Sequence, residues 1–177
     1  FYQEIIEDTR RRFFNTLWNF YSFFVTNINI DNINPKTIDS KLESRSVLDK
    51  WLISKLNSLI VIVRENLEEF QSHKAAAAIE RFIVEDVSNW YIRRSRRRFW
   101  SAEITKDKTD GLITLYETLV AISKIIAPFI PFAAEELYQN LVRRLEKGKK
   151  KKEMLSVHYE EFPKKNSKAI DPHLEEA

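Results

Sequence analysis

The stretch that decides the fold runs from residue 72 to residue 100 and reads SHKAAAAIERFIVEDVSNWYIRRSRRRFW. In its first half, apolar residues recur at spacings of three and four, the pattern of a helix with one buried face; they are Ile79, Ile83, Val87 and Trp90. The alanines at 75–78 allow a neighbouring helix to approach closely. In its second half, arginine replaces the apolar pattern. The stretch predicts one long helix that begins buried in a bundle and ends in a cationic, aromatic surface.

The same spacing predicts two helices before this stretch. The first runs from about residue 5 to 28, and its buried face consists of Phe13, Leu17, Phe20, Phe24 and Ile28. A second apolar stripe predicts that this helix is enclosed on more than one side; it consists of Phe14, Trp18, Tyr21 and Val25. The next helix starts near Ser44 or Ser46, where Ser46 with Asp49 resembles a capping box, and it ends near Phe70. Ser72 is expected to cap the arginine-rich helix that follows.

Two further helices are expected after a turn at 106–111. Thr109 or Asp110 is the expected cap of the fourth helix, which ends before Pro128. Pro131 suits the first turn of a fifth helix that runs to about residue 145, because a first-turn residue needs no backbone donor. Apolar residues at helical spacing support both of these predicted helices.

Composition agrees with a helical fold. The chain has 177 residues and is 44% hydrophobic, enough for a core, while two glycines and five prolines leave little turn material for a sheet. We expect an all-α, antiparallel bundle of about five helices at 1–146. A basic linker and a short extended closing segment follow at 147–163. Residues 164–177 form a tail leading into a following domain, absent here, in which Pro172 is expected to break any helix.

Several functional classes are excluded by what the chain lacks. It has no cysteine, no Gly-rich phosphate loop and no run of 18 apolar residues, so we expect a soluble, cytoplasmic protein. The three histidines (His73, His158 and His173) lack the spacing of metal ligands. The carboxylate pairs at 135–136 and 160–161 have no accompanying base. No catalytic residue, metal or cofactor is expected in this chain.

The candidate binding residues form an arginine cluster on the third predicted helix. No acidic residue lies between Asp86 and Glu103, so the cluster has no oppositely charged partner within its own helix; its members are Arg93, Arg94, Arg96, Arg97 and Arg98. Guanidinium groups pair with phosphates in a bidentate manner, and the flanking Trp90 and Trp100 offer rings on which unpaired bases stack. The cluster favours RNA binding over a solvated or ion-paired surface. The lysine run at 147–152 is more typical of a solvated linker.

Four segments of the chain resemble one family. These are TLWNFYSFFVT (16–26), RSVLDKWLISKLN (45–57), DVSNWYIRRSRRRFW (86–100) and IAPFIPFAAEELY (126–138). Together they resemble the anticodon-binding domain of isoleucyl-tRNA synthetases, in the subclass that also serves valine, leucine and methionine. A closing segment at 156–163 is also similar. The resemblance covers residues 8–177, and the arginine-rich stretch favours isoleucine within the subclass.

This resemblance implies a role in binding transfer RNA. The parent enzyme would use ATP and Mg²⁺ to charge an isoleucine tRNA, but the catalytic signatures His-x-Gly-His and Lys-Met-Ser-Lys-Ser are missing here. The fragment would bind the anticodon arm, beside the catalytic and C-terminal domains of the same polypeptide. The implied tRNA-binding residues are Arg93, Arg94, Arg96, Arg97, Arg98, Trp90, Trp100 and, on the first helix, Asn19.

Two other interpretations stay open. The chain could be the equivalent domain of a valine–tRNA ligase, which would bind a different anticodon. It could instead be a helical module whose arginines bind an acidic protein. Salt-dependent RNA binding distinguishes the acidic-protein interpretation from the other two.

Overall fold

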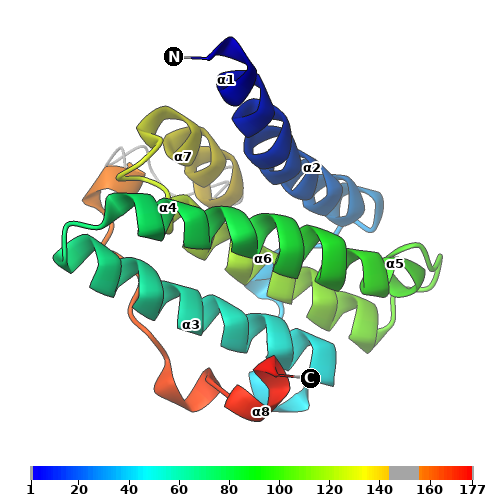
Figure 1. Cartoon of the computed structure of the whole chain (residues 1–177). Coiled ribbons are helices and arrows are strands. Elements are labelled where there is room, and N and C mark those ends of the chain that lie inside the picture. Colours follow the sequence, from blue (N-terminus) through cyan, green and yellow to red (C-terminus); the bar gives the residue numbers. More distant parts are fainter. Residues whose placement is uncertain (1, 144–155, 177) are drawn as a thin grey trace.

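The computed structural model describes residues 2–143 and 156–176, and Figure 1 shows their arrangement. The described residues form helices and turns and include no strand, so the prediction of an all-α bundle is confirmed. The basic linker expected at 147–152 lies outside the described residues.

Five long helical segments make up the described bundle. The first joins α1 (Gln3–Thr9), the π-helical turn η1 (Arg10–Phe14) and α2 (Asn15–Ile30). The second is α3 (Val47–Glu68). The third joins α4 (Ser72–Arg81), the π-helical stretch η4 (Phe82–Ile92) and α5 (Arg93–Phe99). The fourth is α6 (Lys106–Ile125), and the fifth joins α7 (Pro131–Tyr138) to the turn η5 (Gln139–Arg143).

Short elements connect and close these segments. The 3₁₀ turns η2 (Pro35–Thr37) and η3 (Leu42–Ser44) lie between α2 and α3. After the undescribed residues 144–155, the chain forms η6 (Val157–Tyr159), η7 (Ser167–Ala169) and α8 (Pro172–Glu175). The closing segment expected to be extended therefore contains a 3₁₀ turn.

Helix caps agree with the sequence in some places and correct it in others. Ser46 caps α3, because its hydroxyl accepts a hydrogen bond from the Asp49 backbone N–H at 3.3 Å. Thr105, not Thr109 or Asp110, caps α6, so the turn expected at 106–111 is wrong. Ser72 lies inside α4 rather than capping it.

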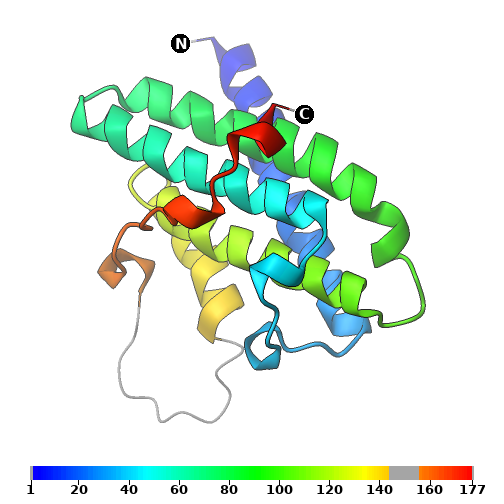
Figure 2. The same ribbon diagram turned by 90° about the horizontal axis from the view of Figure 1, so that it is seen from below.

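The core lies where α2, α3, η4 and α6 meet. α3 and the α4–η4–α5 segment run side by side in opposite directions, α6 packs against them and α2 crosses η4 (Figures 1 and 2). The long apolar stripes of the four segments face one another there. Fully buried side chains from all four fill this volume; they include Phe20, Phe24, Leu52, Ile83, Leu112, Leu115, Leu119 and Ile122.

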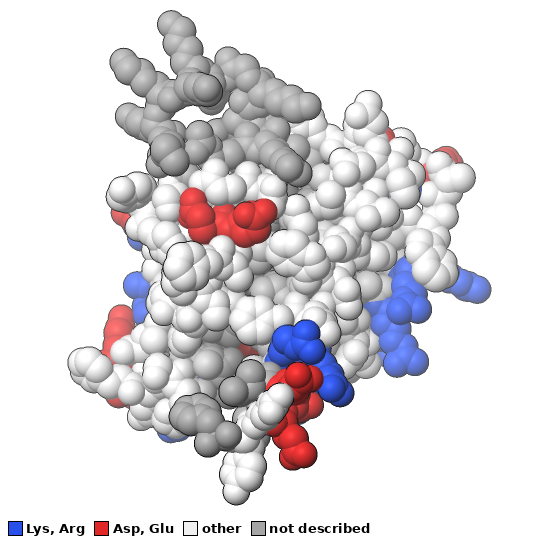
Figure 3. All heavy atoms as spheres, turned by 90° about the horizontal axis from the view of Figure 1, so that it is seen from above, with Lys and Arg blue, Asp and Glu red and all other residues white. Residues whose placement is uncertain are grey.

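The second apolar stripe of the first helical segment is covered only in part, whereas the sequence predicts that it is enclosed. Phe14 and Trp18 keep 39% and 47% of their surface exposed, whereas Tyr21 and Val25 are partly buried. α2 carries no charged residue over its whole length. The face seen in Figure 3 accordingly has a wide area without charge.

Two carboxylates attach the closing segment to the bundle. Glu135 of α7 accepts hydrogen bonds from the Ser156 hydroxyl at 2.8 Å and the Val157 N–H at 2.9 Å. Burial alone would raise the pKa of Glu135, but these hydrogen bonds lower it below the ordinary value. Glu160 accepts from Lys124 at 2.5 Å and from Tyr138 at 2.8 Å, and both bonds lower its pKa. Each carboxylate therefore holds 156–160 most firmly when it is ionised.

Residues 164–176 lie along α3. The Asn166 N–H donates to the Asn57 side chain at 2.7 Å, and the Asp171 N–H donates to the buried Ser54 hydroxyl at 2.8 Å. The Ser54 hydroxyl in turn donates to Glu175. Pro172 opens the short helix α8 instead of preventing one, because the first helical position needs no N–H. The expectation that Pro172 breaks any helix here is wrong; the proposed division at residue 164 stays a prediction.

Candidate nucleic-acid interface

The arginine helix α5 is oriented by its few apolar and small residues. Ser95 and Phe99 are buried, and Ile92 packs against the core just before α5 begins. At about 100° per residue these positions occupy one side of the helix, and Arg93, Arg94, Arg96 and Arg97 are exposed on the rest of its surface. α5 therefore packs on the bundle through Ser95 and Phe99.

Four of the five arginines are exposed and have no acidic partner in the described part of the chain. They are Arg93, Arg94, Arg96 and Arg97. A group of basic side chains stands at the right-hand edge of Figure 3, on the side of the molecule where α5 lies in Figure 1. Unpaired guanidinium groups add little to stability, so this surface is available for an external anion.

Arg98 differs from the other four because it points into the fold. Its side chain is only 13% exposed and forms an ion pair with Asp49 of α3, which is fully buried. It also donates to the Tyr91 hydroxyl at 2.5 Å and to Asp107 of α6 at 3.1 Å. The expectation of five unpaired guanidinium groups is therefore wrong for Arg98, because its partners lie on two other helices.

This network fixes the protonation of its members. Burial alone would lower the pKa of Arg98, but the hydrogen bond and charge of Asp49 raise it above the ordinary value. Burial and the negative charge of Asp49 raise the pKa of Tyr91 well above its ordinary value. Arg98 thus stays charged and Tyr91 stays neutral over the ordinary pH range.

Gly111 provides the space that Arg98 occupies. It lies within α6, and a Cβ atom placed on it would stand 2.3 Å from one Arg98 guanidinium nitrogen. A glycine inside a helix costs about 1 kcal/mol relative to alanine. The close approach of Arg98 explains why a glycine is found here.

Trp90 and Trp51 are neighbouring rings with one cation beside each. The Arg94 guanidinium carbon is 3.8 Å from the Trp90 ring centroid. The ring centroids of Trp51 and Trp90 are 6.2 Å apart, and the Lys55 ammonium lies 5.9 Å from the Trp51 centroid. One face of Trp90 is therefore already covered by Arg94. Trp51 and Lys55 are not among the site residues predicted from the sequence, because they belong to α3 and lie near Trp90 only in the folded chain.

Trp100 and Asn19 are both exposed. Trp100 keeps 72% of its surface accessible, and the Arg96 guanidinium carbon is 5.9 Å from its ring centroid. Asn19 lies on α2, which packs against η4. No hydrogen bond joins the Asn19 side chain to α5 among the described residues, so its place in the same surface stays a prediction.

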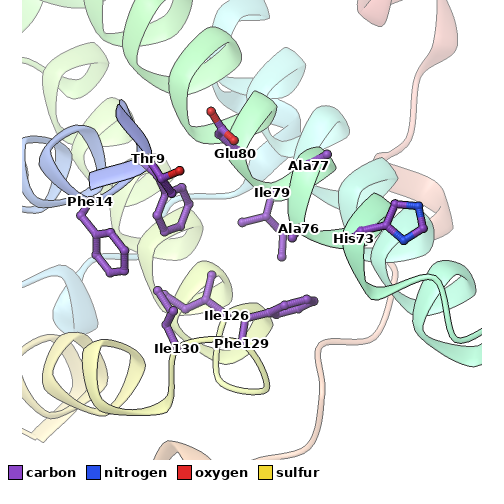
Figure 4. Close-up of a pocket in the computed structure, with 11 residues that line it drawn as sticks. Thr9, Phe14, His73, Ala76, Ala77, Ile79, Glu80, Ile126, Phe129 and Ile130 are labelled. Atoms are coloured by element: carbon purple, nitrogen blue, oxygen red, sulfur yellow. The ribbon is translucent and has the colours of Figure 1, made fainter. Parts of the chain in front are cut away.

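An apolar hollow of about 420 Å³ lies apart from the arginines, between η1, α4 and the α6–α7 junction (Figure 4). Its walls include Phe13, Phe14, Ile79 and Phe129. Glu80 is one of its ionisable residues and pairs with Arg12 at 3.7 Å. The lining of this hollow is mainly apolar, and no arginine of α5 contributes to it.

Comparison with known proteins identifies the protein family to which the chain belongs. Residues 49–177 match the family model for the anticodon-binding domain of tRNA ligases. The chain therefore belongs to this family, and the resemblance seen in the sequence is confirmed. Within the described residues, no helix combines the length and apolar character that crossing a membrane requires.

Similar proteins within this family are isoleucine–tRNA ligases. The chain is 45% identical over 175 residues to an isoleucine–tRNA ligase of Clostridium tetani, 42% identical over 177 residues to one of Dehalococcoides mccartyi and 38% identical over 172 residues to one of Porphyromonas gingivalis. These alignments cover 99%, 99% and 97% of the chain. They cover only 16%, 17% and 14% of the relatives, so the chain spans about one-sixth of their length.

Proposed function

We propose that this chain binds the anticodon arm of an isoleucine tRNA within an isoleucine–tRNA ligase. The observation that carries the proposal is the surface of α5, where Arg93, Arg94, Arg96 and Arg97 are exposed without acidic partners. Family membership supports tRNA as the polyanion, and the names of the relatives support isoleucine. The complete enzyme would charge the tRNA with ATP and Mg²⁺ held in its catalytic domain, and its catalytic and C-terminal domains would be further partners.

Binding would proceed by charge neutralisation on a surface that is already formed. The four exposed arginines would contact phosphates of the anticodon stem and loop and release their counterions. Arg98 would contribute indirectly, since its ion pair with Asp49 fixes the helix that carries the other four. A surface fixed in this way loses little conformational entropy when RNA binds.

The aromatic residues would take different roles. Trp90, covered on one face by Arg94, would hold that guanidinium in place rather than present two free faces to a base. Trp100, largely exposed, would stack on an unpaired base. Asn19 would offer an uncharged hydrogen-bonding group on the neighbouring helix.

A titration against three ligands tests the proposal. The ligands are the anticodon stem-loops of an isoleucine tRNA and of a valine tRNA, and an acidic polypeptide such as polyglutamate. We expect tightest binding to the isoleucine stem-loop, with an affinity that falls steeply as salt rises. Tighter binding to the valine stem-loop would mean that the domain belongs to a valine–tRNA ligase. Binding to polyglutamate without appreciable RNA affinity would refute tRNA binding.

A further inference from the structure

A second hollow lies at the end of the arginine helix. It measures about 520 Å³ and is formed by the end of α2, the end of α5 and the loop that leads to α6. Three large apolar side chains around it are exposed: Trp100 by 72%, Ile30 by 75% and Ile104 by 54%. Single exposed apolar residues are common, but a group of them around one hollow marks a binding surface.

The floor of this hollow is fixed by buried polar contacts. Lys108 of α6 pairs with Asp31, the residue that ends α2, at 2.6 Å, and both side chains are more than nine-tenths buried. Lys108 also donates to the Ser101 carbonyl at 2.8 Å. Below Trp100, the Phe99 ring packs edge-on against Phe23 with centroids 5.4 Å apart. The hollow is therefore already formed without a ligand.

The charges around the hollow match a nucleotide. Lys108 and Asp31 neutralise each other, so the floor carries no net charge. A cation lies beside the hollow, because the Arg96 guanidinium carbon is 5.9 Å from the ring centroid of Trp100. An aromatic platform in an uncharged recess, next to guanidinium groups without carboxylate partners, is the combination by which proteins bind unpaired bases together with their phosphates.

We propose that the hollow between Trp100, Ile30 and Ile104 receives one unpaired nucleobase of the anticodon loop. The base stacks on the Trp100 indole, Ile30 and Ile104 cover its edges, and Arg96 or Arg97 pairs with an adjoining phosphate. This inference rests on the proposed function and adds a defined subsite to it. Stacking is open to every base, so the site selects an unpaired nucleotide rather than a particular sequence.

Two RNA probes separate this subsite from the phosphate surface. One is the anticodon stem-loop of an isoleucine tRNA. The other is the same stem-loop with abasic nucleotides in the loop, which keeps every phosphate and removes the bases. We expect Trp100→Ala to weaken binding of the intact stem-loop on the order of tenfold and to leave binding of the abasic one unchanged. Trp100→Phe, which keeps a ring, should retain most of the affinity.

The control variant is Phe70→Ala. Phe70 is 96% exposed in the α3–α4 turn, at the opposite end of the long helices from α5 (Figure 1). The Phe70→Ala substitution should change the binding of neither RNA probe. The subsite is refuted if Trp100→Ala has no effect on the intact stem-loop, or if it weakens both probes equally. If the parent chain binds neither RNA, the proposed function fails; if it binds both and only the Trp100 effect is missing, the subsite alone fails.

Discussion

Replacing Arg98 by alanine is expected to destabilise the fold by about 3 kcal/mol, because the substitution leaves a buried carboxylate without its counterion. Removing one partner of a buried ion pair costs about 3–5 kcal/mol. We take the lower end because Asp49, which is fully buried, keeps hydrogen bonds from the Tyr91 hydroxyl at 2.5 Å and the Ser46 hydroxyl at 2.8 Å. For a chain of this size, such a loss lowers the melting temperature by about 6–12 °C.

Urea unfolding followed by circular dichroism measures this change. Arg97→Ala is the matched control, because Arg97 is the adjacent, exposed arginine and its loss should change the free energy of unfolding by less than about 0.5 kcal/mol. A double-mutant cycle between Asp49→Ala and Arg98→Ala should give a coupling energy above about 1 kcal/mol. If Arg98→Ala costs no more than Arg97→Ala, the account of Arg98 as the residue that fixes α5 is wrong.

Three further predictions concern Arg98's surroundings and the closing segment. Gly111→Ala should destabilise the chain by about 1–3 kcal/mol, as overpacking does, because its Cβ would meet Arg98; a gain in stability, usual for this change in a helix, would contradict the geometry. Hydrogen bonds lower the pKa of Glu160, and they lower the pKa of Glu135 although its burial acts in the opposite direction. The stability that the two ionised carboxylates contribute is therefore present above their ordinary pKa of 4.5 and is lost as the pH falls through the lower pKa values of the folded chain. Protection against hydrogen exchange at 156–160, measured relative to the intrinsic rate at each pH, should therefore fall on acidification below about pH 4.5 before that of the core, and simultaneous loss would count against this. Ser54→Ala should raise exchange at 171–175 while α3 stays protected, because Ser54 accepts from the Asp171 N–H and donates to Glu175; unchanged exchange would mean that other contacts hold α8.

Local sequence patterns were sufficient to predict most of the helices. Apolar spacing along α2, α3 and η4 was long and regular, and Ser46 with Asp49 marked the start of α3. These features depend on residues within a few positions of one another.

Features that depend on distant residues were missed. Arg98 is 49 positions from Asp49 and nine from Asp107, so no pattern within its helix could indicate that it is paired. Gly111 reads as a turn residue until the guanidinium above it is known. Trp18 fits a helical apolar stripe, yet no described element covers it fully, and 47% of its surface stays exposed. Periodicity identifies a helical face but does not identify the element that packs on it.

The central claim, that the exposed arginines of α5 hold RNA phosphates, is tested most directly by the salt dependence of binding. The measurement compares the parent chain with Arg94→Gln/Arg97→Gln on an isoleucine tRNA anticodon stem-loop. Each lost phosphate contact should flatten the log–log slope by about 0.7–0.9, so the double variant should lose about one to two units.

The control is Lys164→Gln/Lys165→Gln, which removes the same formal charge from exposed residues of the C-terminal segment. It should leave the slope nearly unchanged, and neither pair of substitutions should alter the melting temperature appreciably. An Arg94→Gln/Arg97→Gln chain that melts earlier but binds RNA with the parent slope would contradict the account. A slope reduced by one to two units in a chain of unchanged stability is the result it predicts.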